Sequence, residues 1–128
     1  MPPSSNSFRD LIVWQKAMEL ARQVYALTRR LPKEELYALG DQMRRAAVSI
    51  PSNIAEGQAR DSRKEFANFL SIAKGSNAEL STQLELSTTL GYLPANATAP
   101  VSALCAEVGR MLTTLSSRLK TSSPPTSP

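Results

Sequence analysis

The chain of 128 residues contains no histidine and a single cysteine. Without histidine it can form neither the Ser-His-Asp and Cys-His arrangements of nucleophilic catalysis nor the Glu-x-x-His pairs of di-metal centres in helical bundles. It has no glycine-rich phosphate-binding loop, because Gly75 and Gly109 stand alone within helix-patterned segments. Cys105 lies beside an apolar stripe, where an inert packing role is more usual than a nucleophilic one. These absences predict a protein that is not an enzyme and that uses no cofactor or metal.

Membrane and secretory features are also missing. No apolar run approaches the length that spans a bilayer, and the opening MPPSSNS lacks the charged and apolar regions of a secretory signal. A lone cysteine cannot form an intrachain disulfide and is typical of a reducing compartment. We therefore expect a soluble, cytoplasmic protein with no membrane partner.

The residues that are present favour helices and a mild positive charge. Ala, Leu and Ser are abundant whereas glycine is scarce, which favours a single all-α domain at this length. Fifteen Lys and Arg residues against eleven Asp and Glu residues give a net charge of +4. Such an excess permits a nucleic-acid or acidic protein partner without demonstrating one.

The ends of the chain differ in composition from its middle. Residues 1–6 and 121–128 are rich in Pro and Ser, and we predict that both are disordered. The predicted folded domain is therefore 7–120.

Four segments of the domain place apolar residues at spacings of three and four, which is the pattern of amphipathic helices. They span about 7–31, 36–57, 62–91 and 98–120. The third begins with a Ser-x-x-Glu capping box at Ser62, and Thr98 is the expected N-cap of the fourth. The expected inward stripe of the first is Leu11, Trp14, Met18, Ala21, Tyr25 and Thr28.

Helices of similar length joined by short connections predict an antiparallel up-down-up-down four-helix bundle. Pro51 interrupts the second helix and removes the hydrogen bond to the Ala47 carbonyl. Because the apolar stripe continues in phase on both sides, we predict a kink near Pro51 rather than two separate helices.

A polar band runs beside the apolar stripe of the second helix, and a shorter one lies on the third. The two bands consist of Gln42, Arg45, Ser49, Asn53 (or Ser52) and Glu56, and of Ser76, Glu79 and Gln83. If the two helices are neighbours, Arg45, Glu56 and Glu79 could join Asn53 and Ser76 in a partly buried network across helices or subunits. For Gln42 and Gln83 the plainer interpretation, a solvated position, is favoured. For Asn53 and Glu56 it is not favoured, and for Asn53, beside the predicted kink, a structural role is favoured over ligand binding.

Basic residues gather in three places along the chain. They are Arg29, Arg30 and Lys33, then Arg44 and Arg45, then Arg60, Arg63 and Lys64. Scattered surface charge explains them without a partner, and Arg29 and Arg30 also suit the negative end of a helix. Arg63 and Lys64, in contrast, fall in the first turn of a helix, where cations are unfavourable. A nucleic-acid surface is therefore a candidate.

Several longer stretches resemble a known family. They are Phe8 to Ala17, Leu39 to Ile50, Asn53-Ile54-Ala55-Glu56-Gly57, Phe69-Leu70 and Ala73 to Glu79. Over about residues 8–119 the chain resembles the bacterial four-helix bundle family, also called the large-subunit ribosomal RNA intervening-sequence protein family. The positions that match the family motif are Trp14, Gln42, Arg44, Arg45, Ser49, Asn53, Glu56, Gly57, Ser76 and Glu79.

The resemblance implies an antiparallel four-helix bundle that assembles as a ring-like homopentamer. Five copies of a +4 chain would carry +20, which favours steering of RNA or DNA. A related branch contains the accessory variability determinants of diversity-generating retroelements, which bind nucleic acid and a reverse transcriptase.

Two functional hypotheses follow. The first is a non-enzymatic oligomeric bundle that binds nucleic acid, chiefly structured RNA, by phosphate contacts. The contacting residues would be Arg29, Arg30, Arg44, Arg60, Arg63 and Lys64. The second is a protein-interaction scaffold or accessory subunit, for example for a reverse transcriptase, that does not itself bind nucleic acid.

Overall fold

The computed structural model describes residues 7–121, without the side chain of residue 121, and this part of the chain is entirely helical. The elements in chain order are η1 (Phe8–Asp10), α1 (Ile12–Thr28), η2 (Lys33–Glu35), α2 (Leu39–Gln58), α3 (Arg63–Thr89) and α4 (Ala95–Thr121). The predicted disordered segments, 1–6 and 121–128, lie outside the described residues except that α4 extends to Thr121.

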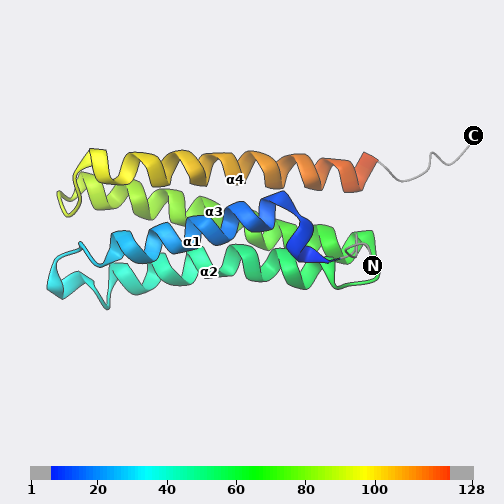
Figure 1. The fold of residues 1–128 in the computed structure, drawn as a ribbon, viewed down its shortest axis with the longest axis horizontal. Coiled ribbons are helices and arrows are strands. Elements are labelled where there is room, and N and C mark those ends of the chain that lie inside the picture. The colour runs from blue at the N-terminus through cyan, green and yellow to red at the C-terminus, as the bar shows by residue number, and fades with distance from the viewer. Residues whose placement is uncertain (1–6, 122–128) are drawn as a thin grey trace, which may run out of the picture.

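The four α-helices pack side by side with alternating direction (Figure 1). Contacts join α1 to α2, α2 to α3, α3 to α4 and α4 to α1, so that α1 and α3 occupy opposite corners of the bundle. The predicted up-down-up-down bundle is confirmed. The α1–α2 and α3–α4 connections lie at one end, and the α2–α3 connection lies at the other together with η1. No helix within residues 7–121 is long and apolar enough to cross a bilayer.

The predicted inward face of the first helix is partly wrong, although Thr28 is buried and Leu11, Trp14 and Ala21 pack against the core. Met18 and Tyr25 are 46% and 44% exposed, whereas Ala17, Leu20 and Val24 are completely buried. Apolar residues cover two sides of this helix, and both sides satisfy the spacing of three and four. The sequence pattern of α1 therefore does not say which side faces the neighbouring helices. The apolar side that faces outward forms a stripe on the surface.

Helix α2 continues through Pro51, which is buried. The prediction that the proline would not divide the segment into two helices is confirmed, and the kink there stays a prediction. Apolar residues face inward on both sides of the proline, because Met43, Ala47, Ile50 and Ile54 are all completely buried.

The capping predictions hold for one long helix and fail for another. Ser62 accepts a hydrogen bond from the Glu65 backbone N–H at 3.0 Å, as its capping box predicts. Thr98, however, lies inside α4, because the Pro94 carbonyl accepts the N–H groups of Ala97 and Thr98 and starts the helix a turn earlier. The Thr98 hydroxyl donates to the Ala95 carbonyl instead of capping.

Candidate nucleic-acid interface

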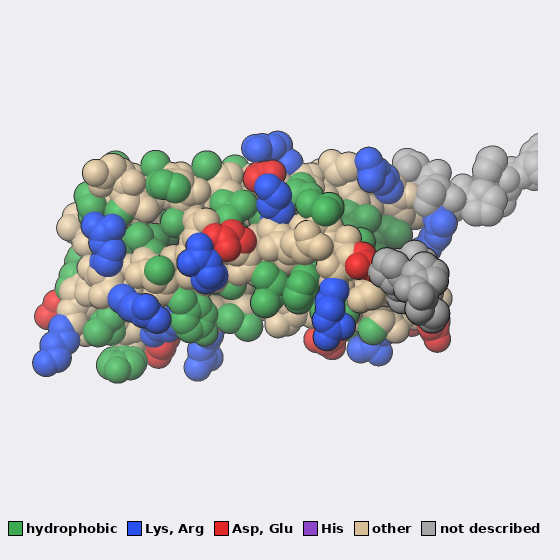
Figure 2. Space-filling view, in the orientation of Figure 1, with side chains coloured by type: hydrophobic (Ala, Val, Ile, Leu, Met, Phe, Trp, Pro, Cys, Tyr) green, Lys and Arg blue, Asp and Glu red, His purple; other side chains and the backbone are tan. Residues whose placement is uncertain are grey.

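The basic residues predicted to bind phosphate lie at opposite ends of the bundle. Arg29 and Arg30 follow α1 at one end, and Arg60, Arg63 and Lys64 surround the α2–α3 connection at the other. Helix α2, which joins the two ends, has 20 residues and is therefore about 30 Å long. On the face that carries α1, Lys and Arg side chains are spread along the bundle (Figure 2). In a single copy, the basic residues predicted to bind phosphate at the two ends therefore form two separate groups.

At the α2–α3 end, acidic neighbours compensate much of the positive charge. Arg60 forms ion pairs with Glu56 at 3.7 Å and with Glu65 at 4.0 Å. Its guanidinium also lies 4.9 Å from the centre of the Phe69 ring. Arg63 has an interaction partner within the fold as well. This end is a weaker phosphate surface than the sequence predicts.

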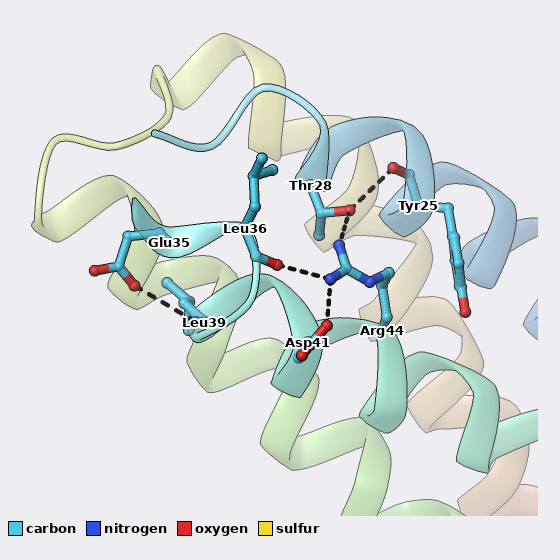
Figure 3. A network of polar contacts seen from close by, with 7 residues as sticks. All are labelled: Tyr25, Thr28, Glu35, Leu36, Leu39, Asp41 and Arg44. Carbon is cyan, nitrogen blue, oxygen red and sulfur yellow. Dashed lines mark hydrogen bonds and ion pairs between the residues drawn. The ribbon is translucent and has the colours of Figure 1, made fainter. Parts of the chain in front are cut away.

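At the α1–α2 end, Arg44 is part of the fold (Figure 3). Its Nη1 donates to Thr28 Oγ1 at 3.1 Å, and its Nη2 donates to the Leu36 carbonyl at 2.7 Å. An ion pair with Asp41 completes the set, and the side chain is only 20% exposed. Arg44 thus ties the end of α1 to the α1–α2 connection, and we do not include it among the phosphate contacts.

Two further hydrogen bonds hold the same connection. Glu35 accepts the Leu39 backbone N–H at 3.4 Å and the Tyr92 hydroxyl at 3.2 Å. Gly40 lies against this corner, where an added Cβ would stand 3.2 Å from both Arg44 Nη1 and the Glu35 carbonyl oxygen. The connection is therefore held by α1, α2 and the α3–α4 connection together.

Between α1 and α2, beside this corner, lies a hollow of about 420 Å³. It is lined by Tyr25, Asp41, Arg44, Arg45, Val48 and Ser49. Arg45 is exposed and forms no ion pair with any residue in 7–121. The hollow therefore combines a free guanidinium, a hydroxyl and an aromatic wall, and we call it the α1–α2 hollow.

The predicted polar network between α2 and α3 forms in part. Asn53 Nδ2 donates to the Ser49 carbonyl at 2.8 Å and to Ser49 Oγ at 2.9 Å. Ser76 Oγ donates to Ser49 Oγ at 2.7 Å, which links α3 to α2. Asn53 bonds the Ser49 carbonyl rather than the Ala47 carbonyl that Pro51 leaves free.

The other members of the predicted network stay apart from it. Glu79 and Gln42 are exposed, and Glu56 pairs with Arg60 on its own side of the bundle. Gln83, which the sequence analysis places in solvent, is 5% exposed and its Oε1 has no partner within the described residues. Antiparallel packing turns this position of α3 toward its neighbours, which its amphipathic pattern alone does not reveal.

Apolar side chains leave additional grooves on the surface. One groove of about 460 Å³ between α1 and α2 is lined by Trp14, Met18, Ala21, Tyr25, Val48, Pro51, Ser52 and Ala55. Trp14, a family-motif position, also packs edge-on against Phe8 with ring centres 5.2 Å apart. On the opposite corner, Ile72 and Leu86 of α3 and Leu90 just after it are about half exposed.

The residues with catalytic potential are few in this part of the chain. Cys105 is buried, its Sγ donates to the Asn77 carbonyl at 3.5 Å, and burial raises its pKa to about 11. A thiol in this state is a poor nucleophile at neutral pH. Among residues 7–121, no group of three or more His, Cys, Asp or Glu side chains is placed to hold a metal ion.

The sequence did not predict two exposed tyrosines and one buried asparagine. Tyr37 is 83% exposed in the α1–α2 connection, Tyr25 faces outward from α1, and Asn77 is buried against Gly109. The exposure of Tyr37 could have been predicted, because it is an aromatic residue outside every apolar stripe.

Comparisons with known proteins agree with this architecture. The family model described as 23S rRNA-intervening sequence protein matches residues 9–114. A crystal structure of a protein of unknown function from the S23 ribosomal protein family of Bacteroides thetaiotaomicron is similar, with a TM-score of 0.76 and 26% sequence identity. The match covers 81% of this chain and 97% of that one. The comparison with curated proteins found no match.

Proposed function

The chain belongs to the 23S rRNA-intervening sequence protein family, and we propose that it is a non-enzymatic, cytoplasmic, oligomeric bundle that binds structured RNA. The observation that carries this proposal is the set of cations at the α1–α2 end. Arg29, Arg30 and Arg45 have no acidic ion-pair partner among residues 7–121. Cations that the fold does not neutralise remain available to phosphate groups.

Their positions suit an extended anion. Arg45 lines the α1–α2 hollow, and Arg30 lines a second groove, between α1 and α4. Arg29 and Arg30 directly follow α1, and both side chains are exposed. Compared with the α2–α3 end, where Arg60 is paired, this end is the stronger candidate for phosphate contacts.

The test is a titration of the purified protein against labelled structured RNA and duplex DNA at several salt concentrations. Saturable RNA binding should weaken steeply as salt rises, because each phosphate contact releases condensed counterions. Replacing Arg29 and Arg30 with Gln should reduce the slope of log K against log salt by about two. Lys64→Gln, at the other end, is the matched control and should have a smaller effect. The proposal fails if no RNA binds at low salt.

A second function, the protein-interaction scaffold, is supported by the apolar surface. Met18 on α1 and Ile72 on α3 are about half exposed and lie on opposite corners of the bundle. Two different apolar faces on one copy suit head-to-tail contacts, which close into a ring. A homopentamer, as the family resemblance implies, is the assembly that we propose.

Light scattering tests this assembly. Ile72→Glu should lower the assembly mass while the helix content stays the same, and Lys74→Glu is a matched control on the same helix. If the mass is that of one copy before any substitution, the ring is excluded. Salt then separates the two functions, because a packed apolar contact with a partner such as a reverse transcriptase weakens little as salt rises.

A further inference from the structure

We infer that the α1–α2 end of the bundle binds unpaired nucleotides, with Tyr25 and Tyr37 stacking on bases and Arg29 and Arg45 contacting phosphates. The inference rests on the proposed RNA binding and adds to it a class of substrate and a surface. We refer to these four residues as the tyrosine–arginine surface.

The two tyrosine rings are exposed. Tyr37 is 83% exposed, and Tyr25 is 44% exposed and forms a wall of the α1–α2 hollow. The side chains of both are without a hydrogen bond to the rest of the described chain, whereas the Tyr92 hydroxyl donates to Glu35. Exposed aromatic rings are the usual platforms for unpaired bases, because every base has a stackable face.

Contacts of Arg44 bring together the chain segments that carry these residues. Arg44 donates to both Thr28 and Leu36, and the residues that follow these two in the chain are Arg29 and Tyr37. Tyr25 and Arg29 are four residues apart at the end of α1, so they lie on the same side of the helix. The labelled residues of Figure 3 show this corner, with Tyr25 beside the Arg44 contacts.

The charge around the surface also favours an anion. Arg29 and Arg45 have no ion-pair partner within residues 7–121, and the carboxylate of Asp41 in the hollow is paired with Arg44. The Glu35 carboxylate accepts hydrogen bonds from two neutral groups. Residues 29–45 carry five Lys and Arg against three Asp and Glu, so that the formal charge of this end is positive.

The exposed tyrosine rings favour an unpaired nucleotide over a paired one. A fully paired RNA helix presents mainly phosphates and 2′-hydroxyls, and its bases are stacked on one another. Such a ligand would use the arginines and leave the tyrosines without a role. The hollow of about 420 Å³ is within the size range of small-ligand pockets and suits a single nucleotide.

The experiment compares an RNA hairpin that has a single-stranded loop with a fully paired duplex of the same stem, by fluorescence anisotropy at fixed salt. We expect the hairpin to bind more tightly. Tyr37→Leu should weaken hairpin binding by about fivefold to a hundredfold and leave duplex binding unchanged. Tyr37→Phe, which keeps the ring, should behave as the unmodified protein. Because Tyr37 is mostly exposed, these variants should fold, and circular dichroism checks that they do.

Two further measurements sharpen the test. A hairpin whose loop lacks bases should bind the unmodified protein as weakly as the intact hairpin binds the Tyr37→Leu variant. The affinity for this hairpin should not change further when Tyr37 is replaced by Leu. Arg45→Gln should reduce the salt slope by about one, whereas Lys64→Gln at the other end should leave hairpin preference intact.

Three results would overturn the inference. If hairpin and duplex bind equally and Tyr37→Leu changes neither, RNA binding stands but the stacking surface does not. If no RNA binds at all, the proposed function fails with it. If Tyr25→Leu changes the assembly mass and not RNA affinity, Tyr25 belongs to an interface between copies.

Discussion

Arg44 and Arg45 are adjacent in the chain and have different surroundings. The Arg44 guanidinium contacts Thr28, Leu36 and Asp41, and its side chain is 20% exposed. Arg45, one position further round the helix, faces the α1–α2 hollow without an ion-pair partner in the described chain. A rotation of about 100° per residue is enough to place neighbours in different environments.

This difference predicts different effects on stability. Arg44→Gln should lower the free energy of unfolding by about 1–3 kcal/mol, because it removes charge-assisted hydrogen bonds to partners that are partly shielded from water. Arg45→Gln is the matched control and should change it by less than about 0.5 kcal/mol. Urea unfolding measures both. Equal effects of the two substitutions would mean that the contacts of Arg44 do not stabilise the α1–α2 connection.

Cys105 provides a prediction about pH. Burial raises the pKa of its thiol to about 11, whereas in the unfolded chain the thiol ionises at its ordinary value of 9.0. The unfolded state therefore loses this proton first as pH rises, and the stability that the buried neutral thiol contributes declines between these two values. Between pH 8 and 10.5 the native protein should lose more stability than Cys105→Ala, which has no thiol to ionise. Parallel losses in urea unfolding would contradict the burial effect.

At the scale of elements, the α2–α3 contact depends on a close approach at Gly57. A Cβ added there would lie 2.8 Å from both Phe66 Cδ1 and Phe69 Cβ, which is too short for an ordinary contact. The hydrogen bond between Ser49 and Ser76 then joins the same two helices further along. Contacts with α3 therefore explain why a glycine stands at 57 and a small hydroxyl residue at 49.

Substitution of two helical glycines tests this contact. Gly57→Ala should destabilise the fold, because overpacking costs about 1–3 kcal/mol and exceeds the gain in helix propensity of about 1 kcal/mol. At Gly75 an added Cβ would meet nothing within 4 Å, so that Gly75→Ala should stabilise the fold by up to about 1 kcal/mol. Thermal unfolding compares the two. A stabilising Gly57→Ala would show that α3 moves away from α2 without cost.

At the scale of the whole molecule, the two ends of the bundle differ in charge. Apolar side chains are exposed at two opposite corners, on α1 and on α3. At the α2–α3 end Arg60 is paired with Glu56 and Glu65, whereas Arg29 and Arg45 at the α1–α2 end are not paired. An assembly of several copies would repeat the unpaired end around a ring and multiply its attraction for an anion.

If such an assembly forms, its stability depends on concentration. The thermal midpoint should rise with protein concentration, because association stabilises the folded state by mass action. Ile72→Glu should weaken this dependence. Differential scanning calorimetry over a hundredfold range of concentration makes the measurement, and a constant midpoint together with the mass of one copy would exclude the ring.

Much of this architecture could be predicted from the sequence. Four amphipathic segments with short connections predict the bundle, and the Ser62 capping box correctly predicts the start of α3. The inward face of α1 could not be predicted, because apolar residues such as Leu20 and Met18 cover two of its sides. The start of α4 was predicted too late. Thr98 fits an N-cap by its residue type, but the Pro94 carbonyl accepts the first N–H groups of the helix one turn earlier.

The sequence by itself determined the helical class, the number of helices and the residue types available for chemistry, because these depend on local spacing and composition. Only the tertiary structure decided which arginines are free, since ion pairs such as that of Arg60 with Glu65 depend on how chain segments meet. Through the contacts of Arg44 it likewise brought the segment that carries Tyr37 to the end of α1, which carries Tyr25 and precedes Arg29. Local patterns specify elements, whereas a surface is made by residues that are distant in sequence and close in space.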